Sequence, residues 1–210
     1  MILIKRNLLK ISYQVNEGVS LIAVSKYRTV DEILLAIDAG QKIFGENKVQ
    51  EAMKKWPEIR EKYPDIELHL IGALQTNKVK EAVKTFDVIE VVDREKLANA
   101  LLKEMKRQDK YPDCLIQVNT GSESQKAGIL PEQADTFISE CIEMGLPIKG
   151  LMCIPPANED PKPHFKILKE FCNRHSLDIC SMGMSGDYEE AIKCGATHIR
   201  VGTAIFGPRP

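Results

Sequence analysis

Short apolar runs rich in β-branched residues alternate with helical patterns along the whole 210-residue chain. The runs are almost continuously apolar, as parallel strands require when both faces of their sheet are covered. Eight such runs are predicted to be strands: 21–25, 42–45, 67–72, 87–92, 114–119, 148–154, 178–185 and 198–202. Eight strands alternating with helices predict a (β/α)8 TIM barrel, an α/β fold that needs at least about 200 residues. We therefore expect one domain, spanning residues 1–210.

A doubly wound open sheet is the alternative arrangement of the same alternating pattern. Its usual marker is a Gly-x-Gly-x-x-Gly turn after the first strand. That position reads SKYRTVDE (25–32), so the barrel is favoured.

Several helix boundaries can be read from the sequence. Thr29 is placed as an N-cap, with Glu32 three residues later as its capping-box partner. Asp93 is the expected N-cap of a second helix, and Pro131 opens a third. The segment 155–163 contains four prolines and is expected to be an irregular loop.

Charge and composition exclude several classes of partner. A formal net charge of -1 gives no electrostatic reason to expect nucleic acid or an anionic membrane as a partner. No apolar run approaches the ~20 residues of a membrane span, and the N-terminal segment lacks the features of a signal peptide. The six cysteines form no C-x-x-C pair, and no histidine lies at ligand spacing, so no metal site is expected. We expect a cytoplasmic protein.

Lys26 directly follows the first apolar run, LIAVS. In a barrel, functional side chains gather at the carboxyl ends of the strands, so Lys26 is expected to face a pocket there. Burial and a nearby positive charge such as Arg200 would lower its pKa. A neutral amine is the form that attacks an aldehyde to make a Schiff base.

Two segments near the end of the chain are suited to binding a phosphate group. Ser185 and Gly186 follow the seventh run, while Gly202 and Thr203 follow the eighth, where TAIFG can form one short helical turn. The loops after strands seven and eight are common phosphate sites in such barrels. Turn and cap chemistry would explain either segment alone. A lysine facing a phosphate site suits pyridoxal phosphate, but a sugar-phosphate site with a general-base lysine fits equally well.

Six motifs occur in order between Leu21 and Pro208: AVSK, FGEN-VQE, H-IG-LQ-NK, GLM-IP, SMGMS-D and R-GTAIFG. On these motifs the chain resembles the YggS/PROSC family, the pyridoxal phosphate homeostasis proteins. The resemblance implies a single (β/α)8 barrel similar to the N-terminal domain of alanine racemase, of the fold-type III class. It also implies that the lysine of AVSK, Lys26, is the cofactor lysine.

The resemblance also implies the remaining contacts of the cofactor. Arg200 would face the pyridine nitrogen, and because an arginine stays charged, it would leave that nitrogen unprotonated and the ring a weak electron sink. Asn47 lies where it could bond near the cofactor's hydroxyl, although a helix cap would explain it as well. The expected cofactor-binding residues are therefore Lys26, Asn47, Ser185, Gly186, Arg200, Gly202 and Thr203.

Four positions bear on how far the family pattern extends. Lys48 stands where the family commonly has tyrosine, Ala73 where proline is usual, and Arg28 where a lysine is often found. Lys126 does match a lysine often present in the family, but a solvated loop charge explains it as well. These departures leave the implied cofactor contacts intact.

The expected function is that of a carrier. A fold-type III racemase needs a second acid/base group, usually a tyrosine from a second domain, and we expect no such domain here. Of its five tyrosines only Tyr27 adjoins the site, and strand alternation points it away. We predict a non-enzymatic pyridoxal phosphate-binding protein that holds the cofactor as a Schiff base on Lys26 and buffers or delivers it, with pyridoxal phosphate-dependent apoenzymes as further partners. A monomer is expected. The alternatives are a racemase-like enzyme acting on a small amino acid and a sugar-phosphate isomerase.

Overall fold

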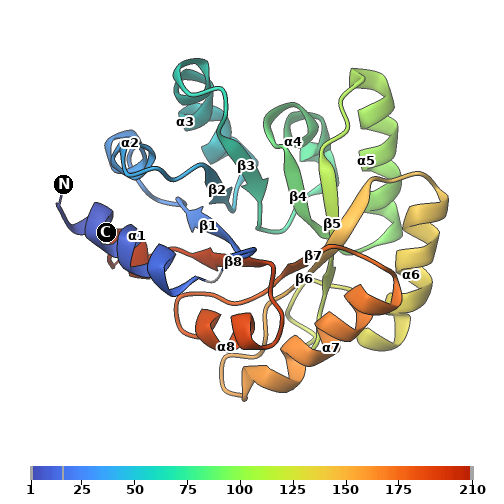
Figure 1. The fold of residues 1–210 in the computed structure, drawn as a ribbon. Helices are drawn as coiled ribbons and strands as arrows, with labels where there is room; N and C mark the ends of the chain where they lie inside the picture. Colours follow the sequence, from blue (N-terminus) through green and yellow to red (C-terminus); the bar gives the residue numbers. More distant parts are fainter. Residues whose placement is uncertain (1, 16, 209–210) are drawn as a thin grey trace.

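The structure is a computed structural model that describes residues 2–15 and 17–208. Eight parallel strands form a closed barrel in chain order, and the last strand pairs with the first (Figure 1). The strands are β1 (Ser20–Val24), β2 (Ile43–Glu46), β3 (Glu67–Leu70), β4 (Val88–Val92), β5 (Asp113–Val118), β6 (Ile148–Cys153), β7 (Ile179–Ser181) and β8 (His198–Val201). The predicted (β/α)8 barrel is confirmed, and the open sheet was the wrong alternative.

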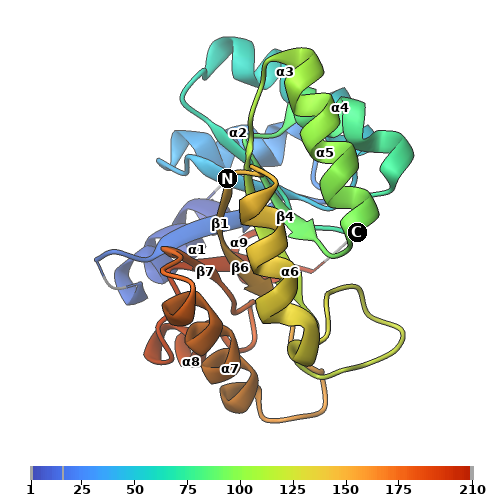
Figure 2. The ribbon, with the colours of Figure 1, turned by 90° about the vertical axis from the view of Figure 1, so that its right-hand side faces the viewer.

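Helices surround the strands on the outside of the barrel (Figures 1 and 2). The N-terminal helix α1 packs against α2 and against the short α9 at the other end of the chain. None of the helices in the described segments is both long and apolar enough to cross a membrane. The helices are α1 (Ile2–Gln14), α2 (Val30–Asp38), α3 (Val49–Lys62), α4 (Val79–Thr85) with the 3-10 turn η1 (Thr76–Lys78) before it, α5 (Glu95–Gln108), α6 (Pro131–Glu143), α7 (Pro161–Arg174), α8 (Tyr188–Lys193) and α9 (Thr203–Phe206).

The start of α2 has the predicted capping box. The Glu32 N–H donates to Thr29 Oγ1 over 3.2 Å, and the Thr29 N–H donates to Glu32 Oε2 over 2.8 Å. Two of the free N–H groups at the helix start are thereby satisfied, which fixes where the chain turns after β1.

The predicted N-cap of α5 was wrong. The N-cap residue is Arg94, and Asp93 instead forms an ion pair with the Arg94 guanidinium. The same guanidinium donates to Leu74 O over 2.9 Å, which ties the start of α5 to the loop after β3. An ion pair with the next residue therefore replaces the capping bond that Asp93 was expected to make.

The proline-rich segment is a loop only in its first part. Helix α7 begins at Pro161, and Asp160 is its N-cap, whose carboxylate accepts from the Lys162 N–H over 3.1 Å. The prediction of an irregular loop through 163 was wrong at this end, because a proline in the first helical turn sacrifices no intrahelical hydrogen bond.

Strand β7 is much shorter than predicted, with three residues in place of 178–185. Gly183 has a φ of +92°, and a Cβ there would lie 2.5 Å from the Cβ of Ala191. This close packing against α8 turns the chain soon after Ser181. Residues 184–187 consequently form a loop at the mouth of the barrel and are not part of the strand.

The core has two parts. Between the strands and helices it is apolar, as in the tilted contact of Phe44 and Trp56, whose ring centroids are 5.1 Å apart. Inside the barrel, several polar side chains are also buried, among them His69, Glu90 and Arg200. A barrel interior is normally filled by branched apolar side chains, so these polar groups require partners.

Candidate functional site

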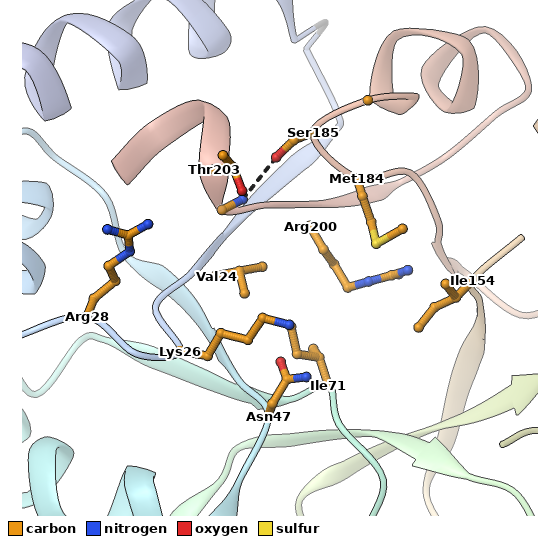
Figure 3. Close-up of a pocket in the computed structure, with 12 residues that line it drawn as sticks. Val24, Lys26, Arg28, Asn47, Ile71, Ile154, Met184, Ser185, Arg200 and Thr203 are labelled. Atoms are coloured by element: carbon orange, nitrogen blue, oxygen red, sulfur yellow. Dashed lines mark hydrogen bonds between the residues drawn. The ribbon is translucent and has the colours of Figure 1, made fainter. Parts of the chain in front are cut away.

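A cavity of about 260 Å³ opens at the carboxyl end of the strands (Figure 3). It lies where the sequence placed the site, and the structure brings all seven predicted residues together in its lining. Sequence reasoning did not assign the other side chains that line it, most of which are apolar: Val24, Arg28, Ile71, Ile154 and Met184.

Lys26 reaches the cavity because of the alternation of side chains along β1. Val24 and Lys26 line the cavity, whereas the hydroxyl of Ser25 between them donates to Glu46 Oε1 on the outer side of the barrel. The Lys26 side chain is half-buried and extends into the cavity toward Asn47 and Ile71 (Figure 3). The lysine at the end of a buried strand is thus directed inward.

Arg200 forms part of the cavity wall and is held in place from two sides. Its Nη1 donates to Ser181 Oγ over 2.7 Å, and its Nη2 donates to Cys153 O over 2.7 Å. The residue is only 4% exposed. A guanidinium retains its charge at any relevant pH, so the cavity contains a fixed cationic donor.

A chain of polar side chains continues from Arg200 through the interior of the barrel. Ser181 Oγ donates to Glu90 Oε2 over 2.6 Å, and Glu90 Oε1 lies 2.6 Å from His69 Nδ1. His69 Nε2 in turn lies 2.6 Å from Glu67 Oε1. Burial acts to raise the pKa of Glu90, but the hydrogen bond and charge of His69, with Arg200 and Ser181, outweigh burial and lower it. Glu90 is therefore a carboxylate that balances the charge of Arg200.

This interior chain was not predicted. Its sequence signal is a charged or polar residue inside an otherwise apolar run, as in LHLI for His69 and VIEVV for Glu90. Such residues are almost never fully buried unless they are paired, so each of them implied a buried partner elsewhere in the barrel.

Backbone N–H groups converge at the loops after β7 and β8. Ser185 Oγ accepts from the Gly202 N–H over 3.3 Å and from the Ala204 N–H over 3.4 Å. An oxygen atom thus stands at the point where donors at the start of α9 converge, and such groups of N–H donors bind oxyanions. A Cβ added to Gly186 would have no atom within 4 Å, so the space beside this loop is open.

Asn47 follows β2 and has a buried side-chain oxygen, Oδ1, without a hydrogen-bond partner in the described parts of the chain. The sequence left open whether it caps a helix; the N-cap of α3 is Lys48, so that alternative was wrong. A Cβ on Gly72 would lie 2.4 Å from Asn47 O, so only glycine lets β3 end this close to Asn47. A buried, unpaired oxygen in a cavity wall is suited to accept from a ligand.

The positions compared with the family pattern, both those that depart from it and Lys126, which matches it, lie at the edge of the cavity or outside it. Arg28 Nη2 donates to Gly207 O over 2.5 Å and to Pro208 O over 2.9 Å, and Figure 3 shows its guanidinium directed away from Lys26. The exposed Lys48 lies over the ring of Tyr27, with Nζ 5.8 Å from the ring centroid. Tyr27 is exposed and does not line the cavity. Lys126 Nζ donates to Pro155 O over 3.0 Å.

The fold and the cavity together define a (β/α)8 barrel protein with a ligand site at the carboxyl end of its strands. Residues 3–210 match the family described as alanine racemase, N-terminal domain. The chain is 40% identical over 206 residues to a pyridoxal phosphate homeostasis protein of Vibrio alginolyticus, covering 92% of this chain and 88% of that one. It therefore belongs to this family, among the YggS/PROSC proteins.

Solved structures agree with this assignment. PipY of Synechococcus elongatus, solved without pyridoxal phosphate, is 35% identical and has a TM-score of 0.91, covering 97% of this chain and all 100% of that one. The same protein with pyridoxal phosphate bound has a TM-score of 0.87. Alanine racemase of Clostridium difficile, at 14% identity and a TM-score of 0.82, covers 100% of this chain and 57% of its own, and shows the shared fold alone.

Proposed function

We propose that this protein binds pyridoxal 5'-phosphate, holds it as a Schiff base on Lys26, and serves intracellular pyridoxal phosphate homeostasis by buffering or delivering it. The observation that carries the proposal is that Lys26, Arg200 and the N–H groups around Ser185 meet in one cavity. The relatives' name and the ligand-bound PipY structure support the same reading.

The cavity fits the parts of this cofactor. The Gly202 and Ala204 N–H groups, the Ser185 hydroxyl and the open space beside Gly186 suit the phosphate. The unpaired oxygen of Asn47 suits the ring hydroxyl, which is a hydrogen-bond donor. The remaining lining is largely apolar, as a flat aromatic ring requires. At about 260 Å³, the cavity lies just below the range of about 300–1,000 Å³ for small-molecule pockets.

The chemistry proposed for Lys26 is reversible and balanced. Its neutral Nζ adds to the aldehyde carbon, a C=N bond replaces the C=O bond, and the oxygen leaves as water. Hydrolysis returns the amine and the free aldehyde, so neither an oxidant nor a reductant is needed. Arg200 is the group we assign to the pyridine nitrogen, and its permanent charge leaves that nitrogen unprotonated.

The lining supports a carrier better than a racemase. Among the lining residues in the described part of the chain, the ionisable ones are Lys26, Arg28 and Arg200. Arg28 is engaged by two backbone carbonyls, and an arginine does not lose its proton. Only Lys26 can then move a proton, whereas racemisation needs acid/base groups on both faces of the substrate. We propose apoenzymes as recipients and a monomeric carrier.

The test is the visible absorption spectrum of the purified protein with pyridoxal phosphate, before and after borohydride. A band that borohydride bleaches, with a pyridoxyl adduct found on Lys26 by mass spectrometry, is expected. Lys26→Ala should lose the band, and Lys48→Ala, which changes an exposed lysine nearby, should keep it. A wild-type protein that gains no band would contradict the proposal. Exchange of the α-hydrogen of an amino acid with labelled water at enzyme-like rates would favour the racemase.

A further inference from the structure

We propose that Lys55 and Glu51, two residues of α3 outside the cavity, are positioning residues that hold the backbone of Lys26 so that Nζ points at the ligand. The inference rests on the proposed function of Lys26. Glu51 ends the motif FGEN-VQE (44–51), of whose residues Asn47 alone lines the cavity, and Lys55 follows one helical turn later.

The two peptide groups that flank Lys26 are each held by one of these side chains. Lys55 Nζ donates to Ser25 O over 3.0 Å, which is the oxygen of the peptide group before Lys26. Glu51 Oε1 accepts from the Tyr27 N–H over 2.6 Å, which belongs to the peptide group after it. The backbone on both sides of the Lys26 Cα is thereby fixed from the outer side of the barrel.

The conformation held in this way is one that a side chain rarely adopts. Tyr27 has a φ of +62°, in the left-handed region that favours glycine. Such a conformation persists where the surroundings over-determine it, and it is most frequent at binding sites. The bond from Glu51 acts directly on the N–H of this strained residue.

Lys55 and Glu51, which together we call the clamp, are themselves anchored in the protein interior. Lys55 Nζ lies 2.9 Å from Glu51 Oε1 and 2.7 Å from Glu46 Oε1, and the Lys55 side chain is only 12% exposed. Glu46 is fully buried and also accepts from Ser25 Oγ over 2.7 Å and from Trp56 Nε1 over 3.2 Å. Lys55 is therefore unlike a solvated surface lysine, whose ion pairs are weak and variable.

The position of the clamp gives a specific consequence for binding. The phosphate donors lie on the loops after β7 and β8, whereas the clamp acts on the turn after β1. Loosening the turn should therefore weaken the covalent link to Lys26 while the phosphate end of the cavity stays intact. Pyridoxamine phosphate has the same ring and phosphate but no aldehyde, so it reports on the non-covalent contacts alone.

The experiment compares Lys55→Met with Lys54→Met, a neighbouring exposed lysine on the same helix. For Lys55→Met we expect the apparent Kd for pyridoxal phosphate to rise about tenfold or more. A displaced Nζ loses at least this factor in the reaction that forms the covalent link. The affinity for pyridoxamine phosphate should remain within about twofold, and hydrogen exchange of the Tyr27 amide should accelerate. Lys54→Met should match the wild type throughout.

Glu51→Gln is the second variant, chosen because it keeps an oxygen that can accept from the Tyr27 N–H while removing the charge beside Lys55. Glu51→Gln is expected to fold even in the case that Lys55→Met fails to fold. It should raise the apparent Kd for pyridoxal phosphate and accelerate exchange of the Tyr27 amide, both by less than Lys55→Met does. The inference is overturned if Lys55→Met and Glu51→Gln behave like Lys54→Met, or if pyridoxamine phosphate affinity falls as much as that for pyridoxal phosphate. If the wild type binds no pyridoxal phosphate, the proposed function fails, and the exchange of the Tyr27 amide still decides whether the clamp exists.

Discussion

Glu90 and Arg200 lie on strands β4 and β8, on opposite sides of the barrel, and are joined through a single hydroxyl group. Ser181 Oγ donates to Glu90 Oε2 over 2.6 Å and accepts from Arg200 Nη1 over 2.7 Å. The closest direct contact between the two charges is 3.9 Å. All three side chains are buried, so the orientation of Arg200 in the cavity depends on a carboxylate that no ligand would touch.

Removing that carboxylate is expected to be costly. Glu90→Gln should lower the free energy of unfolding by about 3–5 kcal/mol, because the charge that balances Arg200 and His69 is lost inside the barrel. Urea unfolding at pH 7 measures the loss, with Glu58→Gln, an exposed position on α3, as the control. The control should change by less than about 0.5 kcal/mol. Equal stability of the two variants would contradict the buried pairing.

The stability of the barrel should depend on pH through His69. Burial acts to lower the pKa of His69, but the hydrogen bonds and charges of Glu67 and Glu90 outweigh burial and raise it to about 9. Because the folded pKa exceeds the unfolded value of 6.5, the stabilisation is complete below pH 6.5 and is lost as pH rises through about 9.

The comparison that isolates this effect is wild type against His69→Gln. The difference in their free energies of unfolding should shrink by about 3 kcal/mol between pH 6.5 and 9.5. Urea titrations at several pH values give the curve, and groups that titrate in both proteins cancel in the difference. A difference independent of pH over this range would show that His69 is not held as an imidazolium.

The sequence predicted the strands and the cavity residues because both depend on local signals. Apolar runs mark strands that are covered on both faces, and the barrel brings residues at their carboxyl ends together. Lys26, Arg200 and Ser185 could be placed by position along the chain alone. The partners of these residues could not be predicted in this way. Glu90 is linked to Arg200 only in the closed barrel, where the arrangement of all eight strands determines which side chains face inward.

The same reasoning explains the missed clamp and the errors at helix ends. Lys55 and Glu51 lie on α3, a helix not singled out in the sequence, and Pro57 lies within it. Which face α3 turns toward β1 is decided by packing, as in the contact of Trp56 with Phe44. Local signals also gave the wrong N-cap for α5, because the Asp93 carboxylate forms an ion pair with Arg94 in place of the expected capping hydrogen bond. Pairings across distant elements are the part that a sequence pattern leaves undetermined.

Ser185 is expected to contribute to phosphate affinity with little effect on stability. Ser185→Ala removes the hydroxyl at which the Gly202 and Ala204 N–H groups converge. One hydrogen bond contributes about 0.5–1.5 kcal/mol, so the affinity for pyridoxamine phosphate should fall about two- to tenfold. Isothermal titration measures it, with Ser139→Ala on the exposed face of α6 as the control. An unchanged affinity would place the phosphate elsewhere in the cavity.

Arg28 should stabilise the end of the chain that carries two of the cavity residues. Its guanidinium bonds to Gly207 O and Pro208 O, lies 3.2 Å from Glu32 Oε1, and has its Cζ 5.6 Å from the ring centroid of Phe206. Arg28→Ala should lower the free energy of unfolding by about 1.5–3 kcal/mol and accelerate amide exchange in 203–207.

A lysine at this position tests whether charge or geometry matters. Arg28→Lys should recover less than half of the lost stability, because a single ammonium cannot reproduce a planar fork that reaches two carbonyls and a carboxylate. Arg6→Ala, at an exposed position on α1, is the control. Since α9 begins directly after Gly202, the exchange rates of 203–207 and the affinity for pyridoxamine phosphate should change together in Arg28→Ala. Faster exchange without a loss of affinity would show that the phosphate end of the cavity does not depend on this anchor.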